Sequence, residues 1–169
     1  MSWLPGGRLL YNHRGTLHVV DVASGKDQPL AVRGPKPMPI FTTSSDGRWL
    51  AYQTSTPESG VDMAVASIPE GEGRWLVRSP KEDYHASGTA AGTWLYFQMD
   101  HRNVWRVPGP AQGWRPAPPQ QVTFVNEPGL FLEDPQVSAD GRRLFYSKIR
   151  TEGDLWVVDL PSEHAPDNP

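Results

Sequence analysis

The sequence contains no cysteine among its 169 residues, which excludes disulfide bonds, thiolate metal ligands and cysteine nucleophiles. It has no apolar run near the roughly 18 residues that a membrane helix needs. The formal net charge is −3 and no basic stripe accumulates, which argues against a nucleic-acid partner. The absence of cysteine does not fix the compartment, so both a periplasmic and a cytoplasmic bacterial location stay open.

Motifs for enzymatic chemistry are also missing. There is no Gly-x-Ser-x-Gly elbow and no glycine-rich phosphate loop, so the sequence shows no motif for nucleophilic catalysis or nucleotide chemistry. No histidine and carboxylate residues stand at the local spacing of a zinc site. We therefore expect a protein that is not an enzyme and has no catalytic residue, no metal site and no cofactor.

Helical periodicity is absent as well, because no stretch of 11 to 18 residues keeps an apolar residue at every third or fourth position. Instead the chain has 18 prolines and 16 glycines, which together make about one residue in five. Such frequent breakers punctuate short strands and leave no room for a long helix. The composition predicts an all-β domain.

One short pattern occurs four times along the chain. The copies are PGGRLLYN (5–12), SDGRWLAYQ (45–53), AAGTWLYFQ (90–98) and ADGRRLFYS (139–147). Their aligned glycines, at 7, 47, 92 and 141, are 40, 45 and 49 residues apart, which is typical of one four-stranded propeller blade per repeat. Each turn is followed by alternating large apolar residues, as in a strand. We predict that four leucines are buried in equivalent places, namely Leu10, Leu50, Leu95 and Leu144.

The remaining strands can be placed around these hairpins. Third strands are expected at 17–22, 63–68, 104–107 and 155–160, and outermost strands at 29–32, 75–78 and 121–124. Inner strands are expected at 40–43, 85–89 and 136–138. The sequence thus predicts a β-propeller of about four antiparallel blades, with incomplete blades at both ends. The blade units are 1–35, 36–80, 81–127 and 128–160, and a C-terminal tail follows at 161–169.

The hairpin S-x-D-G-R-x-L-x-Y followed by DLWVVDL, together with FTTSSDGRWLAY, resembles the repeats of the TolB-like β-propellers. The likeness covers about residues 2 to 160. This family includes sensor and interaction propellers as well as propellers attached to peptidases. The resemblance implies a blade scaffold and carries no catalytic motif.

Repeat geometry indicates a candidate binding face. The Asp-Gly turns lie on one face of the propeller, and the longer and more varied loops, at 56–60, 81–85, 99–103, 128–134 and 149–153, gather on the other. Binding residues concentrate in such loops on a rigid scaffold. The residues that we select as a possible partner-binding or ligand-binding face are Tyr84, His85, Asp100, His101, Arg102, Trp114, Glu133 and Asp134.

Several of these residues have two interpretations. His85 either enters the central channel, where it could bind a metal or an anionic group, or is a structural histidine. His85 and His101 could share a metal only if a carboxylate such as Asp134 joined them. Glu133 and Asp134 are adjacent in an extended segment and so point to opposite faces, which argues against a carboxylate pair. Trp114 is the best candidate for an exposed aromatic ring.

The leading interpretation is a non-enzymatic propeller that binds a protein partner or a small ligand through its loop-rich face. The alternatives are a propeller accessory domain of a peptidase, or a lyase-like propeller with a metal in its channel. Incomplete blades at both ends also predict a homodimer, in which two chains complete one ring. The same role could be filled by further blades of a longer parent protein.

Overall fold

The computed structural model describes residues 1–58, 60–78, 83–88, 92–109, 117–138 and 140–153. All regular structure in these ranges is β-strand, and no helix of membrane-spanning length and hydropathy occurs among them. The prediction of an all-β fold is confirmed.

The strands form four antiparallel sheets, which we call blades 1 to 4. Blade 1 consists of β1 (Ser2–Leu4), β2 (Arg8–His13), β3 (Thr16–Asp21) and β4 (Asp27–Leu30). Blade 2 consists of β5 (Phe41–Thr43), β6 (Trp49–Thr56), β7 (Gly60–Ser67) and β8 (Gly73–Val77). Blade 3 consists of β9 (Asp83–Gly88), β10 (Trp94–Met99), β11 (Asn103–Pro108) and β12 (Gln120–Gln121). Blade 4 contains β13 (Leu130–Val137) and β14 (Leu144–Arg150), and its expected third strand at 155–160 lies outside the described residues.

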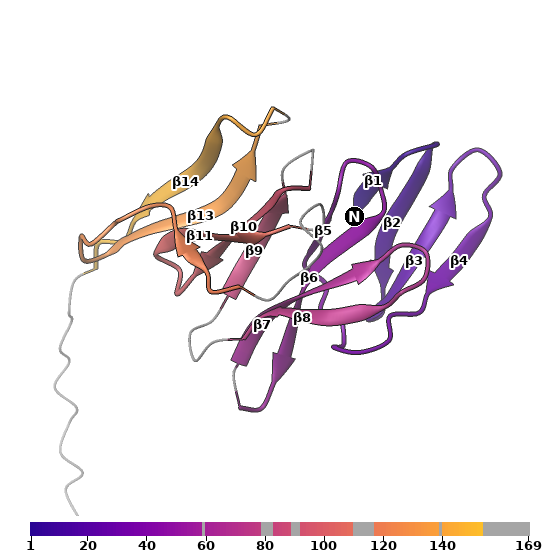
Figure 1. Ribbon diagram of the computed structural model, residues 1–169, viewed down its shortest axis with the longest axis horizontal. Coiled ribbons are helices and arrows are strands. Elements are labelled where there is room, and N and C mark those ends of the chain that lie inside the picture. Colours follow the sequence, from indigo (N-terminus) through magenta and orange to yellow (C-terminus); the bar gives the residue numbers. More distant parts are fainter. Residues whose placement is uncertain (59, 79–82, 89–91, 110–116, 139, 154–169) are drawn as a thin grey trace, which may run out of the picture.

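The blades follow one another as in a propeller (Figure 1). Each four-stranded blade pairs its strands in chain order, and the first strands β1, β5, β9 and β13 contact one another in succession. These first strands are therefore the inner strands, and β4, β8 and β12 are the outer ones. The prediction of an incomplete first blade is wrong, because residues 2–4 form the inner strand β1 and blade 1 has all four strands. For blade 4 the described residues contain two strands, and the rest of the expected blade lies outside them.

The Asp-Gly turns are built alike in blades 2 and 4. In blade 2 the Ser44 hydroxyl donates to Asp46 Oδ1 at 2.6 Å, and the same oxygen accepts the Arg48 N–H at 3.1 Å. Gly47 follows with φ of 67°, a conformation that glycine adopts without strain. In blade 4 the hydrogen bonds from Ser138 and from the Arg142 N–H lower the pKa of Asp140 below its usual value.

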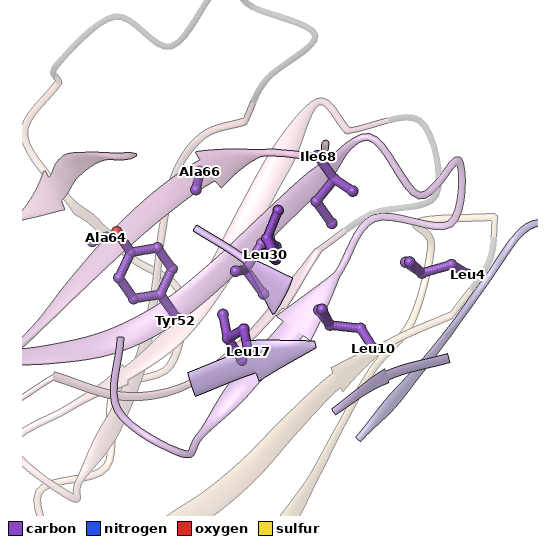
Figure 2. Close-up of a cluster of buried hydrophobic side chains, with 9 residues drawn as sticks. Leu4, Leu10, Leu17, Leu30, Tyr52, Ala64, Ala66 and Ile68 are labelled. Carbon is purple, nitrogen blue, oxygen red and sulfur yellow. The ribbon is translucent and has the colours of Figure 1, made fainter. Parts of the chain in front are cut away.

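Three clusters of buried side chains fill the spaces between successive blades. The cluster between blades 1 and 2 contains Tyr52 and leucines from all four strands of blade 1 (Figure 2). Phe97 and Met63 lie in the cluster between blades 2 and 3. Tyr96, Val104 and Leu132 form the cluster between blades 3 and 4. The core is thus divided among the three interfaces between successive blades.

Of the four repeat leucines, Leu10, Leu50 and Leu95 are buried as predicted, whereas Leu144 is only partly buried. The predicted equivalence of Leu10 with the other three is wrong. In blade 2 six residues separate the paired residues Thr43 and Leu50, whereas in blade 1 only five separate Trp3 and Leu9. The backbone hydrogen bond that Arg48 makes with Ile68 in blade 2 is made in blade 1 by Gly7 with Val22. The structural equivalent of Leu50 is therefore Leu9. A shift of one residue turns a side chain to the opposite face of its strand, so Leu10 packs toward blade 2.

One predicted loop is also corrected. Residues 128–134 were expected to form a connection on the binding face, but β13 already begins at Leu130. Glu133 and Asp134 therefore belong to an inner strand. This change matters for the site, because an inner strand lines the centre of the propeller.

Candidate functional site

A pocket of about 250 Å³ lies where the inner strands of blades 2, 3 and 4 meet. Its lining comes from β5, β6, β7, β9 and β13 and from the residue before β5. The lining residues are Ile40, Phe41, Thr42, Ala51, Gln53, Met63, His85, Ala86, Asp134 and Gln136. Two of the eight residues selected from the sequence, His85 and Asp134, are among them.

Matching β-bulges place these two residues. In β9 the residues His85 and Ala86 together stand opposite Phe97, since the pairing moves from Tyr96–Ser87 to Gln98–Tyr84. In β13 the register shifts in the same place, and Asp134 with the following proline stands opposite Tyr146. Phe97 and Tyr146 each lie two residues after the repeat leucine, so the two bulges are equivalent positions of neighbouring blades. Bulges of this kind re-aim a side chain.

The bulged residues have left-handed backbone conformations. The φ angle is 46° at His85 and 51° at Asp134. Such values are uncommon for residues with a Cβ, and they cluster at sites where the surrounding structure holds a side chain in a required place. Here both bulges direct their side chains to the same pocket.

The two side chains form a hydrogen bond across the blade interface. His85 Nδ1 lies 2.5 Å from Asp134 Oδ1, and both side chains remain partly exposed. A carboxylate at this distance fixes the orientation of the imidazole ring and favours a proton on Nδ1. Because solvent screens an exposed pair, its contribution to the stability of the fold is small. The pair is therefore better suited to shaping the pocket than to holding the blades together.

Gln53 contributes a buried polar group to the same pocket. Only 2% of this residue is exposed, and its Nε2 has no hydrogen-bond partner. A buried unpaired donor costs about 1–3 kcal/mol. Gln98 in blade 3 and Asn12 in blade 1 occupy the equivalent position, and their side-chain nitrogens are unpaired too. Of these three carboxamides, Gln53 is the one that lines the described pocket.

Other selected residues lie elsewhere. Asp100, His101 and Arg102 form the turn between β10 and β11, in which the first two have positive φ angles, and they do not line this pocket. Glu133 precedes the bulge of β13 and is also not part of the lining. The backbone of Tyr84 pairs with Gln98 in β9, but its side chain lies outside the described residues. Trp114 lies outside them as well.

The histidine and carboxylate residues do not gather into a larger cluster in the described ranges. Among residues 1–58, 60–78, 83–88, 92–109, 117–138 and 140–153, no group of three or more histidine, aspartate or glutamate side chains is placed to hold a metal ion. His85 and Asp134 come together, whereas His101 is not part of the pocket.

Sequence reasoning missed Gln53, Gln136 and the apolar lining residues Phe41 and Met63. A usable signal existed for Gln53, because a carboxamide follows the repeat leucine by three residues in both blade 2 and blade 3. The apolar residues gave no such signal, since alternating apolar positions in a strand are normally core.

Comparison with solved structures places the chain among propellers of this kind. It matches a putative TolB from Agrobacterium tumefaciens with a TM-score of 0.67 and 14% identity, over 90% of this chain and 61% of that one. It matches an oligogalacturonate lyase in complex with manganese with a TM-score of 0.67 and 13% identity, over 87% and 45% of the two chains. For TolB from Acinetobacter baumannii the TM-score is 0.63, the identity 16% and the coverage 86% and 36%. No family model and no curated protein matches the sequence.

These likenesses establish the fold. The chain spans between about a third and three fifths of the length of these three structures. Its blades therefore correspond to part of a larger propeller protein in each comparison.

Proposed function

We propose that this chain, which has the β-propeller fold of TolB-like proteins, is a non-enzymatic binding module whose ligand site is the pocket between the inner strands of blades 2, 3 and 4. The observation that carries the proposal is the convergence of His85 and Asp134, from equivalent bulges of neighbouring blades, on one pocket. Both residues have an uncommon left-handed backbone conformation, although the exposed contact between their side chains stabilises the fold little.

The rest of the pocket suits a small organic ligand. Ligand sites are concave, mostly apolar and provided with a few convergent polar groups. Half of the lining is apolar, from Ile40 to Met63 and Ala86, and the polar groups are the hydrogen-bonded pair, two glutamines and a threonine. The apolar wall and the convergent polar groups support the binding of a ligand.

The experiment is a fragment screen by ¹H–¹⁵N NMR, comparing the wild type with His85→Ala. We expect fragments to shift resonances of β5, β9 and β13 in the wild type and to lose these effects in the variant. His18→Ala is the matched control, because His18 pairs with Asp27 at 3.3 Å on blade 1, away from the pocket. Fragment binding that survives His85→Ala, or that maps to other strands, would contradict the proposal.

We also propose a protein partner, namely a second copy of this chain that completes the propeller ring as a homodimer. Phe145 occupies the β14 position at which blades 1, 2 and 3 have Leu10, Ala51 and Tyr96, all of which pack against the next blade. Yet Phe145 is 56% exposed, and Trp3 on the inner strand of blade 1 is 67% exposed. Uncovered apolar faces at both ends suit a second copy arranged with two-fold symmetry. Light scattering should give twice 18.8 kDa, and a stable mass of 18.8 kDa on dilution would refute the dimer.

A lyase-like metal site is the second candidate, favoured by the fold likeness to the manganese-bound oligogalacturonate lyase. His85 and Asp134 would supply two of the ligands that such a site requires. Calorimetric titration with manganese, zinc and calcium tests it. Heat of binding that disappears in His85→Ala would favour this candidate over the non-enzymatic module, and absence of heat would remove it.

A further inference from the structure

We infer that another pocket, between blades 1 and 2, binds a small organic molecule that carries one carboxylate and an apolar body. This pocket has a volume of about 260 Å³, and its lining comes from β2, β3, β4 and the turn between β7 and β8. It shares no lining residue with the pocket at His85 and Asp134. The inference therefore goes beyond the proposed function and concerns a separate site.

The strand register of blade 1 gathers three charged residues at one end of the sheet. Arg8 pairs with Asp21 across β2 and β3, and the Asp21 N–H donates to the carbonyl of Lys26 at 2.9 Å across the next turn. Residues two apart in a strand share a face, so Arg8 lies on the face of Leu10 and Asp21 on that of Val19. Leu10 and Val19 both pack in the cluster between blades 1 and 2. The charges therefore lie at the edge of this blade junction.

Arg8 departs from the residue that the repeat has at its position. Its equivalents are Trp49 in blade 2 and Trp94 in blade 3, because in all three blades the carbonyl of the preceding residue accepts the same backbone hydrogen bond. Trp94 packs against the cluster between blades 3 and 4. In blade 1 the large apolar ring is replaced by a cation that lines a pocket. This junction thus has a positive group where blades 2 and 3 have an indole.

Cations outnumber carboxylates in the lining, which contains Arg8, Lys26 and Asp21. Asp21 Oδ1 accepts hydrogen bonds from the N–H and the hydroxyl of Ser24, both at 2.7 Å, and these bonds lower the pKa of Asp21. Asp21 is therefore a carboxylate that is already bound within its own turn. Neither Arg8 nor Lys26 forms an ion pair with another of the described residues. One carboxylate of a ligand would balance the remaining positive charge.

The guanidinium of Arg8 is held for such a contact. Its Nε donates to the carbonyl oxygen of Pro5 at 3.1 Å, which anchors the side chain beside the turn between β1 and β2. That bond does not use the two Nη groups, and a guanidinium can bind both oxygens of a carboxylate through two parallel N–H donors. The ammonium group of Lys26 supplies a further point charge.

Apolar residues form most of the remaining wall. Val19 and Leu30 come from blade 1, and Ile68 and Pro69 from blade 2, with Leu30 and Ile68 drawn in Figure 2. At about 30 Å³ for each water molecule in the liquid, 260 Å³ corresponds to roughly nine waters, so the ligand is small. An apolar ring or branched chain gains from covering this wall, which a bare anion does not do. A small monocarboxylate with an apolar body matches both parts of the pocket.

The test uses four probes that separate charge from apolar contact. Cyclohexanecarboxylate has both features, cyclohexanecarboxamide has the ring without the charge, and acetate and inorganic phosphate have charge without a ring. Each is titrated at constant ionic strength into ¹⁵N-labelled protein, and the shifts of the Val19, Leu30 and Ile68 resonances give the dissociation constant. We expect about 1–10 mM for cyclohexanecarboxylate, a range suited to so small a ligand. The other three probes should bind about tenfold more weakly.

Three substitutions test the charged residues. Arg8→Gln and Lys26→Gln should each weaken cyclohexanecarboxylate binding about three- to tenfold and reduce its preference over the amide, because a partly exposed cation is lost. Arg8→Trp installs the residue of blades 2 and 3 and should abolish binding of both cyclohexane probes, since the ring takes up the apolar space. Lys148→Gln is the matched control, because it removes an exposed lysine of β14 that does not line the pocket. It should leave binding unchanged.

Every outcome decides for or against the inference. Equal binding of the carboxylate and the amide would show that the cations are not used, and equal binding of acetate or phosphate would show that the apolar wall is not used. Equal weakening by Lys148→Gln would assign the effect to net charge alone. Each of these results, or the absence of shifts at about 50 mM cyclohexanecarboxylate, overturns the inference. His85→Ala should not affect these titrations, so their failure and the failure of the fragment screen are distinguishable.

Discussion

The register of blade 1 can be tested with two neighbouring leucines. Alignment of the four repeats by their glycines predicts that Leu10 is the counterpart of Leu50, whereas the structure gives this role to Leu9. Leu10 is fully buried and packs with Leu17, Leu30 and Tyr52 between blades 1 and 2. Leu9 lies on the opposite face of β2, away from blade 2, and is only half-buried.

Truncation of Leu10 to alanine should therefore be the more damaging change. A fully buried leucine costs about 2–5 kcal/mol when cut to alanine, because transfer energy is lost and a cavity remains. For a chain of this size each kcal/mol lowers the melting temperature by about 2–4 °C, which gives a decrease of about 4–20 °C. Leu9→Ala should cost less than about 2 kcal/mol, since part of that side chain stays in water in the native state.

Urea unfolding monitored by tryptophan fluorescence measures both values. The slope of the free energy against urea should be the same in both variants, so that the midpoints report stability directly. A double-mutant cycle of Leu10→Ala with Leu50→Ala should give a coupling of about 0.5–3 kcal/mol, because both side chains lie in one cluster. If Leu9→Ala were as destabilising as Leu10→Ala, or if the coupling were zero, the register described for blade 1 would be refuted.

Three further outcomes are expected. Gln53→Leu and Gln98→Leu should each leave the free energy of unfolding unchanged or raise it by about 1 kcal/mol, because each removes an unpaired buried donor; a loss of stability in urea would show that the amides are structural. Burial raises the pKa of Tyr52 to about 12, so the unfolded chain loses the phenolic proton at lower pH than the folded chain does. The stability of the fold should therefore fall as the pH rises from about 10 to 12. In thermal unfolding experiments across this pH range, Tyr52→Phe should show a less steep decline than the wild type. Arg48→Ala should change the melting temperature little, since Arg48 is 74% exposed and pairs only with Asp46 within its own turn; a decrease of several degrees would contradict this.

The fold was predictable because its signals are local and repeated. Asp-Gly turns, alternating apolar residues and a spacing of 40 to 49 residues each recur along the sequence, and all three indicate antiparallel blades. The error in blade 1 comes from the choice of glycine in the alignment. Tyr11 and Asn12 follow Gly6 by the same five and six residues by which Tyr52 and Gln53 follow Gly47, so aligning Gly6 would have given the observed register. That single residue decides which face of β2 enters the core.

The candidate site was predictable only in part. The sequence identified His85 and Asp134 as separate candidates, but their contact depends on two bulges and on the packing of one blade against the next, 49 residues along the chain. Pro135 is typical of a bulge in β13, but no such residue marks the bulge of β9. Glu133 and Asp134 were expected to point to opposite faces of a regular strand, and this argument could not anticipate that the bulge redirects Asp134.

The position of the paired bulges has a consequence for how such a protein can diversify. If whole blades were copied, a unit from blade 3 would bring a histidine at the bulge and one from blade 4 would bring an aspartate. Neither copy alone reproduces the pair, which forms only where two unlike units become neighbours. Recombination that changes the order of blades would therefore create or erase such a site at a junction without altering a single residue inside any blade.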